Sequence, residues 1–271
     1  MTAQQLRTWP VDNIVDRNIT IALNGHESWR PTDAEPPTGR PMTLRDALVY
    51  SRNRVTAQLI QKESPEKVAR LARAMGVRES PLEAVPSLAL GTSPVTLKEM
   101  VSAYSTIANR GAYIEPRMVT RIEDHDGKVL AEFPSAAPEP ALPAGAAETL
   151  VDVTRDVVNR GTGAGIRTRF GIRVEVAGKT GTRQDNTDSW FILMHPQLVA
   201  GAWVGFDDGR VTLGNDYWGE GAHSALPMVG AFYDMALRAR VIDPDAQFGP
   251  ETRPPRTVHA RRHRHFLFWR F

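Results

Sequence analysis

Three apolar runs follow one another in the last third of the chain, and they restrict its fold more than any other feature. They are VEVAG (174–178), SWFILMH (189–195) and LVAGAWVGF (198–206), separated only by short polar stretches. Apolar runs of this length bounded by turn residues are typical of buried strands, and the short connections favour an antiparallel meander. A helical pattern over 222–240 follows, with Pro227 near its start.

Helices are predicted upstream of this meander from their start signals. Thr43 and Ser64 are N-cap candidates, and Thr96 with Glu99 forms a capping box. A further helical pattern covers 146–161. Helices that precede a meander with a closing helix indicate an α+β fold, in which helices pack on an antiparallel sheet.

We expect one domain over residues 1–242 and a basic, disordered tail over 243–271. Residues 251–271 hold six arginines and one acidic residue, a net charge of +5, although the whole chain carries only +2. Contact of this tail with anionic lipid or nucleic acid is the alternative, but we predict no nucleic-acid partner.

The composition excludes several kinds of site. The chain contains no cysteine, which excludes disulfides, thiolate metal sites and cysteine nucleophiles. We expect neither a metal nor a cofactor. No stretch approaches the ~20 apolar residues that span a bilayer. The N-terminus does not combine a basic start with an apolar core, so we expect no export signal in this chain.

Lys179 stands in the sequence GKTG, directly after the first apolar run. A phosphate loop is excluded because it needs a glycine where Arg173 stands, and because a strand pattern follows. The glycine-rich GTGAG at 161–165 is a poor dinucleotide fingerprint, since it follows a helix. The alternative is a Lys-Thr-Gly strand at a sheet edge, where Lys179 and Thr180 point to opposite faces. Such a strand can pair with an extended peptide and bind its carboxylate.

Ser51 and Asn53 form the sequence SRN within the first helical pattern. On a continuous helix, residues two apart point about 200° away from each other, so both could not serve one site. Either Ser51 is a buried polar residue of the helix, or the helix breaks there and Asn53 is the N-cap of a second helix. We favour the break, which predicts that Ser51 lies within hydrogen-bond reach of Lys179.

These segments together resemble the penicillin-binding proteins, specifically the transpeptidase domain of the class A, bifunctional enzymes. The resemblance is carried by GRPMTLRDALVYSRNRVTAQL, SLALGTSPVTLKEM, VVNRGTGAG, VAGKTGTRQDNTDSWF and LVAGAWVGFDD, between about Val11 and Leu237. The motif set S-x-x-K, S-x-N and K-T-G belongs to this superfamily. The resemblance implies a penicillin-binding transpeptidase fold and cross-linking of peptidoglycan by serine acyl transfer.

The family resemblance also implies roles for the site residues. Ser51 would relay a proton, Asn53 would bind a substrate amide, and Lys179 would hold Ser51 and the local positive field. The segment Thr180, Gly181 and Thr182 would bind the substrate, with both threonine hydroxyls near its terminal carboxylate and the Thr182 N–H in the oxyanion hole. Implied ligands are the peptidoglycan stem peptide and β-lactams, at the periplasmic or extracytoplasmic face of the membrane. The residues do not indicate an oligomeric state.

The nucleophile of the family is the serine of S-x-x-K, which precedes S-x-N in the chain. The one S-x-x-K here, Ser64 to Lys67, follows S-x-N and fits an exposed helix start. We therefore expect a domain truncated after the nucleophile helix and inactive alone. The alternative is a non-catalytic peptide-binding or scaffolding module. Loss of that helix is expected to expose Leu44, Leu48 and Val55 along an open groove.

This interpretation predicts that the 271-residue chain forms no covalent adduct with a fluorescent penicillin, because neither Ser51 nor Ser64 is the family's nucleophile. The measurement is in-gel fluorescence after denaturation, with peptide mapping of any labelled band. A stable acyl group on Ser51 or Ser64 would contradict the prediction.

Overall fold

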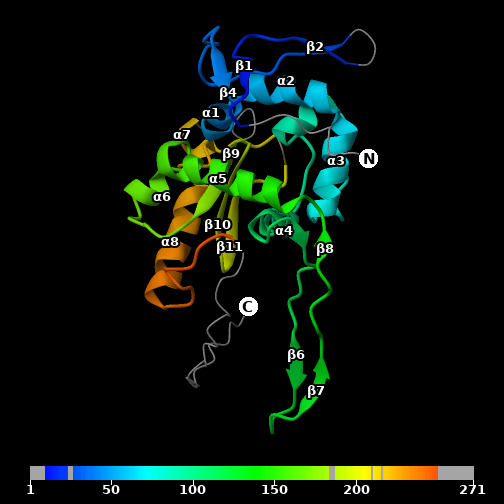
Figure 1. Ribbon diagram of the computed structural model, residues 1–271, viewed down its shortest axis with the longest axis vertical. Coiled ribbons are helices and arrows are strands. Elements are labelled where there is room, and N and C mark those ends of the chain that lie inside the picture. Colours follow the sequence, from blue (N-terminus) through cyan, green and yellow to red (C-terminus); the bar gives the residue numbers. More distant parts are fainter. Residues whose placement is uncertain (1–9, 24–26, 183–186, 209, 215, 250–271) are drawn as a thin grey trace.

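The computed structural model describes residues 10–23, 27–182, 187–208, 210–214 and 216–249. Its described residues form a three-stranded antiparallel sheet with helices on both faces, a helical layer above it and a long hairpin arm below (Figure 1). The predicted α+β class is confirmed. The helices are α1 (Leu44–Val49), α2 (Asn53–Glu63), α3 (Pro65–Met75), α4 (Leu97–Ala108), α5 (Ala144–Arg160), α6 (Gly165–Thr168), α7 (Asp216–Gly219), α8 (Ala225–Arg238) and the 3-10 turn η1 (Pro86–Leu90).

The sheet consists of three strands in the order β11-β10-β9, each antiparallel to its neighbour. The strands are β9 (Ala177–Thr182), β10 (Asp188–His195) and β11 (Leu198–Gly205). The predicted meander is correct, but its first strand begins at Ala177 and not at Val174. The strand register explains the shift, because Ala177 pairs with Met194 and β10 ends at His195, so residues 174 and 175 lie beyond the end of the partner strand. The guanidinium of Arg167 instead donates to the carbonyl oxygens of Ile172 and Val174, both at 2.8 Å. The strand continues to Thr182 and so includes the K-T-G sequence itself.

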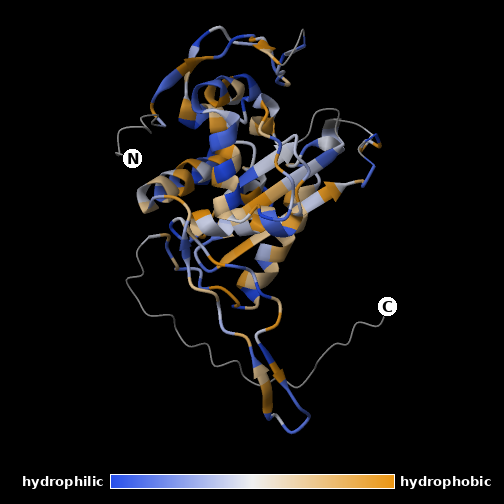
Figure 2. Ribbon diagram, turned by 90° about the vertical axis from the view of Figure 1, so that its right-hand side faces the viewer, coloured by the Kyte–Doolittle hydropathy of each residue, from blue (hydrophilic) through white to orange (hydrophobic). Residues whose placement is uncertain are grey.

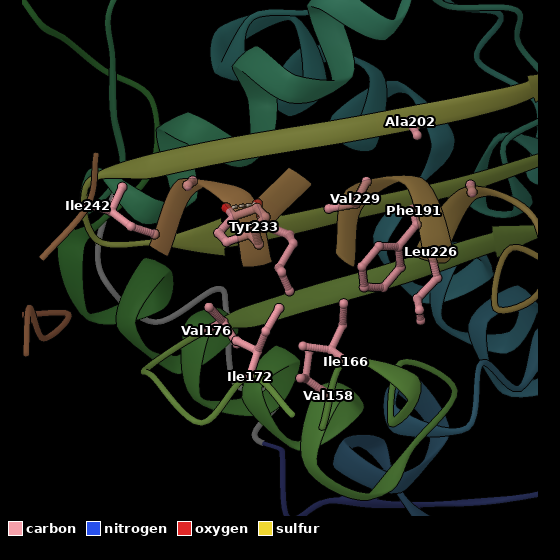
Figure 3. Packing of buried hydrophobic residues seen from close by; sticks show 13 residues of the cluster. Val158, Ile166, Ile172, Val176, Phe191, Ala202, Leu226, Val229, Tyr233 and Ile242 are labelled. Atoms are coloured by element: carbon pink, nitrogen blue, oxygen red, sulfur yellow. Dashed lines mark hydrogen bonds between the residues drawn. The ribbon is translucent and has the colours of Figure 1, made fainter. Parts of the chain in front are cut away.

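The main core lies between the sheet and α8 (Figure 3). Phe191 from β10 packs with Leu226 and Val229 of α8, and all three side chains are almost fully buried. The hydroxyl of Tyr233 lies 2.8 and 2.7 Å from the carbonyl oxygens of Leu193 and Leu198, and burial raises its pKa. A buried tyrosine needs such a polar partner. The helix α8 is thus tied to the β10–β11 turn.

Helices α4 and α5 cover the opposite face, where Met194 and Ala177 pack with Val151 and Ile107. Figure 2 shows hydrophobic colouring along the central strands and a mixture of hydrophobic and hydrophilic colouring on the helices. The two faces follow from the period of two along β10, since Phe191 and Leu193 face α8 while Met194 faces α4 and α5.

The predicted helix starts are confirmed. The hydroxyl of Thr43 accepts from the N–H of Asp46 at 3.0 Å, and Ser64 caps α3 by accepting from the N–H of Lys67. The capping box of Thr96 and Glu99 at the start of α4 is complete. The serine of the only S-x-x-K sequence thus serves as the N-cap of α3.

The turn-rich sequence of residues 1–42 predicts irregular structure, but the described part of the N-terminal region contains two short strand pairs. The proline-rich sequence 134–145 predicts an extended surface linker, but it contains a strand, because two more pairs form the arm and its base. The pairs are β1 (Asn13–Val15) with β4 (Pro41–Thr43), β2 (Ile21–Ala22) with β3 (Ser28–Trp29), β5 (Ala112–Tyr113) with β8 (Glu139–Pro140), and β6 (Arg121–Glu123) with β7 (Val129–Glu132).

The open groove expected along Leu44, Leu48 and Val55 is absent from the described part of the chain. Val55 is fully buried against Ile14 and Ala47, and the two leucines are half-buried. The prediction was wrong because Ile14, from the segment before α1, packs on Val55, while Leu48 packs against Val153 and Val157 of α5. None of the described helices is long and apolar enough to cross a membrane.

The beginning of the predicted tail packs on the domain. The N–H of Asp243 donates to Gln197 at 2.7 Å, and Phe248 contacts the cluster under α4 and α5. Residues 250–271 lie outside the described residues. The division of the chain at 242 therefore stays a prediction.

Glu99 generates a prediction about stability and pH. It is 2% exposed, and although burial alone would raise its pKa, hydrogen bonds from Ser80, Thr96 and Glu79 lower that pKa to about 2. A carboxyl group whose pKa is depressed on folding stabilises the protein above its unfolded pKa, so this contribution is lost as pH falls from about 4.5 to about 2. The shift corresponds to roughly 3 kcal/mol.

We expect Glu99→Gln to lower the free energy of unfolding at pH 7 by about 2–3 kcal/mol and to flatten its dependence on pH below 4.5. Urea unfolding at pH 7, 4 and 3 measures both effects. The control is Glu79→Gln, which breaks the exposed ion pair with Lys98 and should change little. Parallel pH profiles for wild type and Glu99→Gln would contradict the assignment.

Candidate active site

Lys179 lies on β9, the edge strand of the sheet, and its side chain reaches the turn between α1 and α2. Its Nζ donates to Ser51 Oγ at 2.9 Å, across 128 residues of sequence, and to the carbonyl oxygen of Thr180 at 2.9 Å. The predicted contact between Ser51 and Lys179 is therefore confirmed. It joins the S-x-N and K-T-G segments into one site.

The helix breaks at Ser51, as predicted. The helix α1 ends at Val49, α2 begins at Asn53, and Ser51 has a φ of 54°. A left-handed conformation is uncommon for a non-glycine residue and must be held by its surroundings. Here the N–H groups of Ser51 and Arg52 donate to the last carbonyl oxygens of α1, at 3.2 and 2.8 Å. The break leaves the Ser51 side chain exposed.

Asn53 departs from its predicted position. It was expected to be an N-cap, but it is the first residue of α2, and the cap is supplied by the carboxylate of Asp33. The side chain of Asn53 instead donates from Nδ2 to the carbonyl oxygen of Thr32 at 2.8 Å. The local sequence alone could not reveal this, because the capping acceptor lies 20 residues upstream.

Burial lowers the pKa of Lys179 to about 8. The cause is desolvation, since an ammonium is less stable away from water. At pH 7 roughly a tenth of the molecules would then carry a neutral amine. A lysine in this range can donate a proton and recover it close to neutral pH.

The two threonines of β9 have different environments. Thr180 is only 7% exposed, and its hydroxyl lies 2.6 Å from that of Thr162. Thr182 is exposed, and its hydroxyl accepts from the N–H of Gly221 at 3.2 Å. The strand register pairs Lys179 with Ile192 and Thr180 with Phe191, which confirms the predicted alternation of faces. The Thr180 hydroxyl thus ties β9 to the residues that follow α5.

Gly181 lies opposite Trp190 in the sheet. A Cβ on Gly181 would come within 3.0 Å of the Trp190 Cβ, and a Cβ on Gly221 would meet the carbonyl oxygens of both residues. Glycine at these positions allows the segment before α8 to lie directly against the end of β9.

Thr162 is a site residue that the sequence reasoning missed, because GTGAG was considered as a dinucleotide fingerprint and as part of the family resemblance, but no site role was given to its threonine. Its N–H lies 3.4 Å from the carbonyl oxygen of Val49, at the end of α1, and its hydroxyl contacts Thr180. A Cβ on Gly161 would overlap the Val49 carbonyl oxygen, so only glycine permits this approach. The sequence feature that could have identified this site is Gly161, because a glycine directly after a helix can mark a close approach of two backbones.

Possible metal ligands do not gather at Lys179. Among the described residues, Asp124, His125 and Asp126 could hold an ion, with ligand atoms within 4.8 Å of one another. They lie on the β6–β7 arm, on a different element from the lysine and Ser51 (Figure 1). The geometry around Lys179 instead offers hydroxyls and one cation, which suit a peptide carboxylate.

Residues 7–200 match the family model of the penicillin binding protein transpeptidase domain. The chain belongs to the transpeptidase domain family of the class A penicillin-binding proteins. Penicillin-binding protein 1A of Neisseria meningitidis is 32% identical over 221 residues, which cover 78% of this chain and 26% of that protein. The chain therefore spans about a quarter of the length of such curated relatives.

Solved structures show the same fold. Penicillin-binding protein 1A from Haemophilus influenzae matches with a TM-score of 0.79 and 23% identity, over 89% of this chain and 40% of that one. PonA1 from Mycobacterium tuberculosis, in complex with penicillin V, matches with a TM-score of 0.69 and 21% identity, over 89% of this chain and 66% of that one. The transpeptidase fold expected from the motifs is confirmed.

The contact between Thr162 and Thr180 generates a prediction. Thr162→Val removes the hydroxyl but keeps the shape, so it should destabilise the fold by about 1 kcal/mol and shift the backbone amide resonances of β9. Thr162→Ser keeps the hydroxyl and should leave these resonances in place. Thermal unfolding and ¹H–¹⁵N spectra measure both. Equal spectra for the two variants would show that the hydroxyl contact does not hold the strand.

Proposed function

We propose that this domain forms the S-x-N and K-T-G side of a serine D,D-transpeptidase site, which cross-links peptidoglycan stem peptides by acyl transfer outside the cytoplasmic membrane. The observation that carries the proposal is the 2.9 Å hydrogen bond from Lys179 to Ser51. It supports the family's pairing of these two motifs. β-Lactams are proposed as ligands of the same site, in line with the penicillin V complex of PonA1.

The strand β9 supplies the binding surface in this proposal. It is an edge strand, so its outer backbone groups can pair with an extended peptide. The hydroxyl of Thr182 already accepts from the N–H of Gly221, which leaves its hydrogen to donate to a carboxylate. The positive charge of Lys179 strengthens that recognition. The hydroxyl of Thr180 contacts that of Thr162, which holds β9 in place.

Ser51 and Lys179 supply the proton path. Because Nζ of Lys179 donates to Ser51 Oγ, the serine hydrogen is free to point toward the open side. From there it can pass to the amine that leaves when the peptide bond breaks. Lys179 then replaces the proton on Ser51, and a pKa near 8 makes this transfer easy at neutral pH. Asn53 contributes its amide oxygen to the substrate, since its NH₂ group is held by Thr32.

The family resemblance gives the role of nucleophile in this mechanism to the serine of an S-x-x-K sequence. Ser64 does not fill that role, because its hydroxyl caps α3. A non-catalytic peptide-binding module would share the same binding surface but would never be acylated. The nucleotide sequence upstream of Met1 distinguishes the two, since an in-frame S-x-x-K supports the enzyme.

The proposal predicts that the chain binds a short acylated peptide that ends in D-Ala-D-Ala. Titration followed by ¹H–¹⁵N spectra should shift the amides of 177–182, and the peptide carboxamide should bind more weakly. Lys179→Met should weaken binding by about tenfold, or ~1.4 kcal/mol, because the cation near the carboxylate is lost. Lys128→Met, on the exposed arm, is the matched control. Equal affinity for the acid and the carboxamide would contradict carboxylate recognition.

A further inference from the structure

The first turn of α2 is capped from outside its own helix. Arg52 stands at the N-cap, and its side chain makes no cap bond. The first N–H groups of a helix have no partner within the helix, so they need an external acceptor. The carboxylate of Asp33 accepts from the N–H of Asn53 at 2.5 Å and of Arg54 at 3.3 Å. Asp33 therefore performs the task that an N-cap residue usually performs.

The carboxylate of Asp33 is held in this position by an ion pair and by burial of its side chain. Its side chain is 4% exposed and forms an ion pair of 3.0 Å with Arg54, which is 6% exposed. Asp16 lies 3.7 Å from the same guanidinium. A buried carboxylate is stable only when it is paired and hydrogen-bonded, and a negative charge is favoured at a helix N-terminus. Asp33 meets each of these conditions at one place.

The segment 32–35 also forms bonds with the residues of the turn that neighbour Ser51. The carbonyl oxygen of Thr32 accepts from the side chain of Asn53 at 2.8 Å, and Glu35 forms an ion pair with Arg52. Three consecutive residues of the turn, 52 to 54, are thus held by the segment 32–35. This segment provides the anchor on the α2 side of Ser51, whereas the α1 carbonyl oxygens provide the other.

We propose that Asp33 is a positioning residue of the active site, which fixes the turn of Ser51 to Asn53 by capping α2 and so holds Ser51 against Lys179. The chemical meaning of this inference rests on the proposed transpeptidase function. The coupling from Asp33 to Lys179 is a property of the fold. Without the carboxylate, the first turn of α2 frays, Ser51 leaves its left-handed conformation, and water reaches the lysine.

Competitive trace acetylation of the 271-residue chain across pH 6 to 11, read by mass spectrometry of the lysine peptides, tests the proposal. In the wild type, Lys179 should titrate near 8. In Asp33→Ala it should titrate closer to an ordinary lysine, because hydration favours the ammonium. In Asp33→Asn it should stay near 8, since asparagine also caps helices well. Lys98, which forms a surface ion pair with Glu79, is the internal reference.

The matched control is Ser64→Ala, which removes a cap from α3. Like Asp33→Ala, this variant removes one helix cap, but it should leave the titration of Lys179 unchanged. The proposal is overturned if folded Asp33→Ala keeps Lys179 near 8, or if Ser64→Ala shifts it equally. It is also overturned if Asp33→Asn shifts Lys179 as far as Asp33→Ala, since the ion pair with Arg54 would then be the cause.

If Asp33→Ala does not fold, the proposal can still be tested by measuring amide hydrogen exchange in the unmodified chain. The amides of Asn53 and Arg54 should exchange as slowly as those inside α2. The first amides of α5, whose start at Pro143 has no side-chain cap, should exchange quickly. Fast exchange at Asn53 and Arg54 would overturn the proposal.

Peptide affinity separates the two proposals. If the wild type binds no peptide ending in D-Ala-D-Ala, the transpeptidase function fails, while the titration of Lys179 still decides the role of Asp33. If the wild type binds and Asp33→Ala weakens binding several-fold without unfolding, both proposals are supported.

Discussion

The fold is organised around a lysine ammonium that is partly removed from water at the edge of a sheet. Burial lowers the pKa of Lys179 to about 8, which means that the charged form is disfavoured there. Two acceptors offset this cost, Ser51 Oγ and the carbonyl oxygen of Thr180. One of them comes from a helix break 128 residues away, so both the burial of the lysine and this hydrogen bond last only while α1, α2 and β9 stay in place.

Close approach of backbone segments at glycines brings α1, α5 and β9 together. Gly161 lets the end of α5 touch the carbonyl oxygen of Val49 at the end of α1, and Thr162 then reaches Thr180 on β9. Gly178, directly before the lysine, is equally restricted, because a Cβ there would lie 2.6 Å from the carbonyl oxygen of Ile192. Glycine thus serves packing at these places, since none of the contacts would tolerate a side chain.

The structural features that could be predicted from the sequence are those fixed by contacts between residues close together in the chain. Helix starts at Thr43, Ser64 and Thr96 follow from side-chain oxygens that bond amides within the same turn. The break at Ser51 followed from the directions of neighbouring helical residues and from the family motif. The cap from Asp33 could not be predicted, because its acceptor and donors are 20 residues apart. The late start of β9 depends likewise on its partner strand, because β10 ends at His195, before it could pair with residues 174 and 175.

The segment before α1 has more influence on the site than its irregular sequence suggests. Ile14 covers Val55, and Asp16 and Asp33 both face the Arg54 guanidinium at the first turn of α2. The expected exposed groove did not form because Ile14 of this segment covers Val55 and α5 covers Leu48. The same residues therefore bury the apolar face of α2 and fix the turn that presents Ser51. Since one stretch of chain carries both tasks, a change that loosens its packing also moves the hydrogen bond on which Lys179 depends.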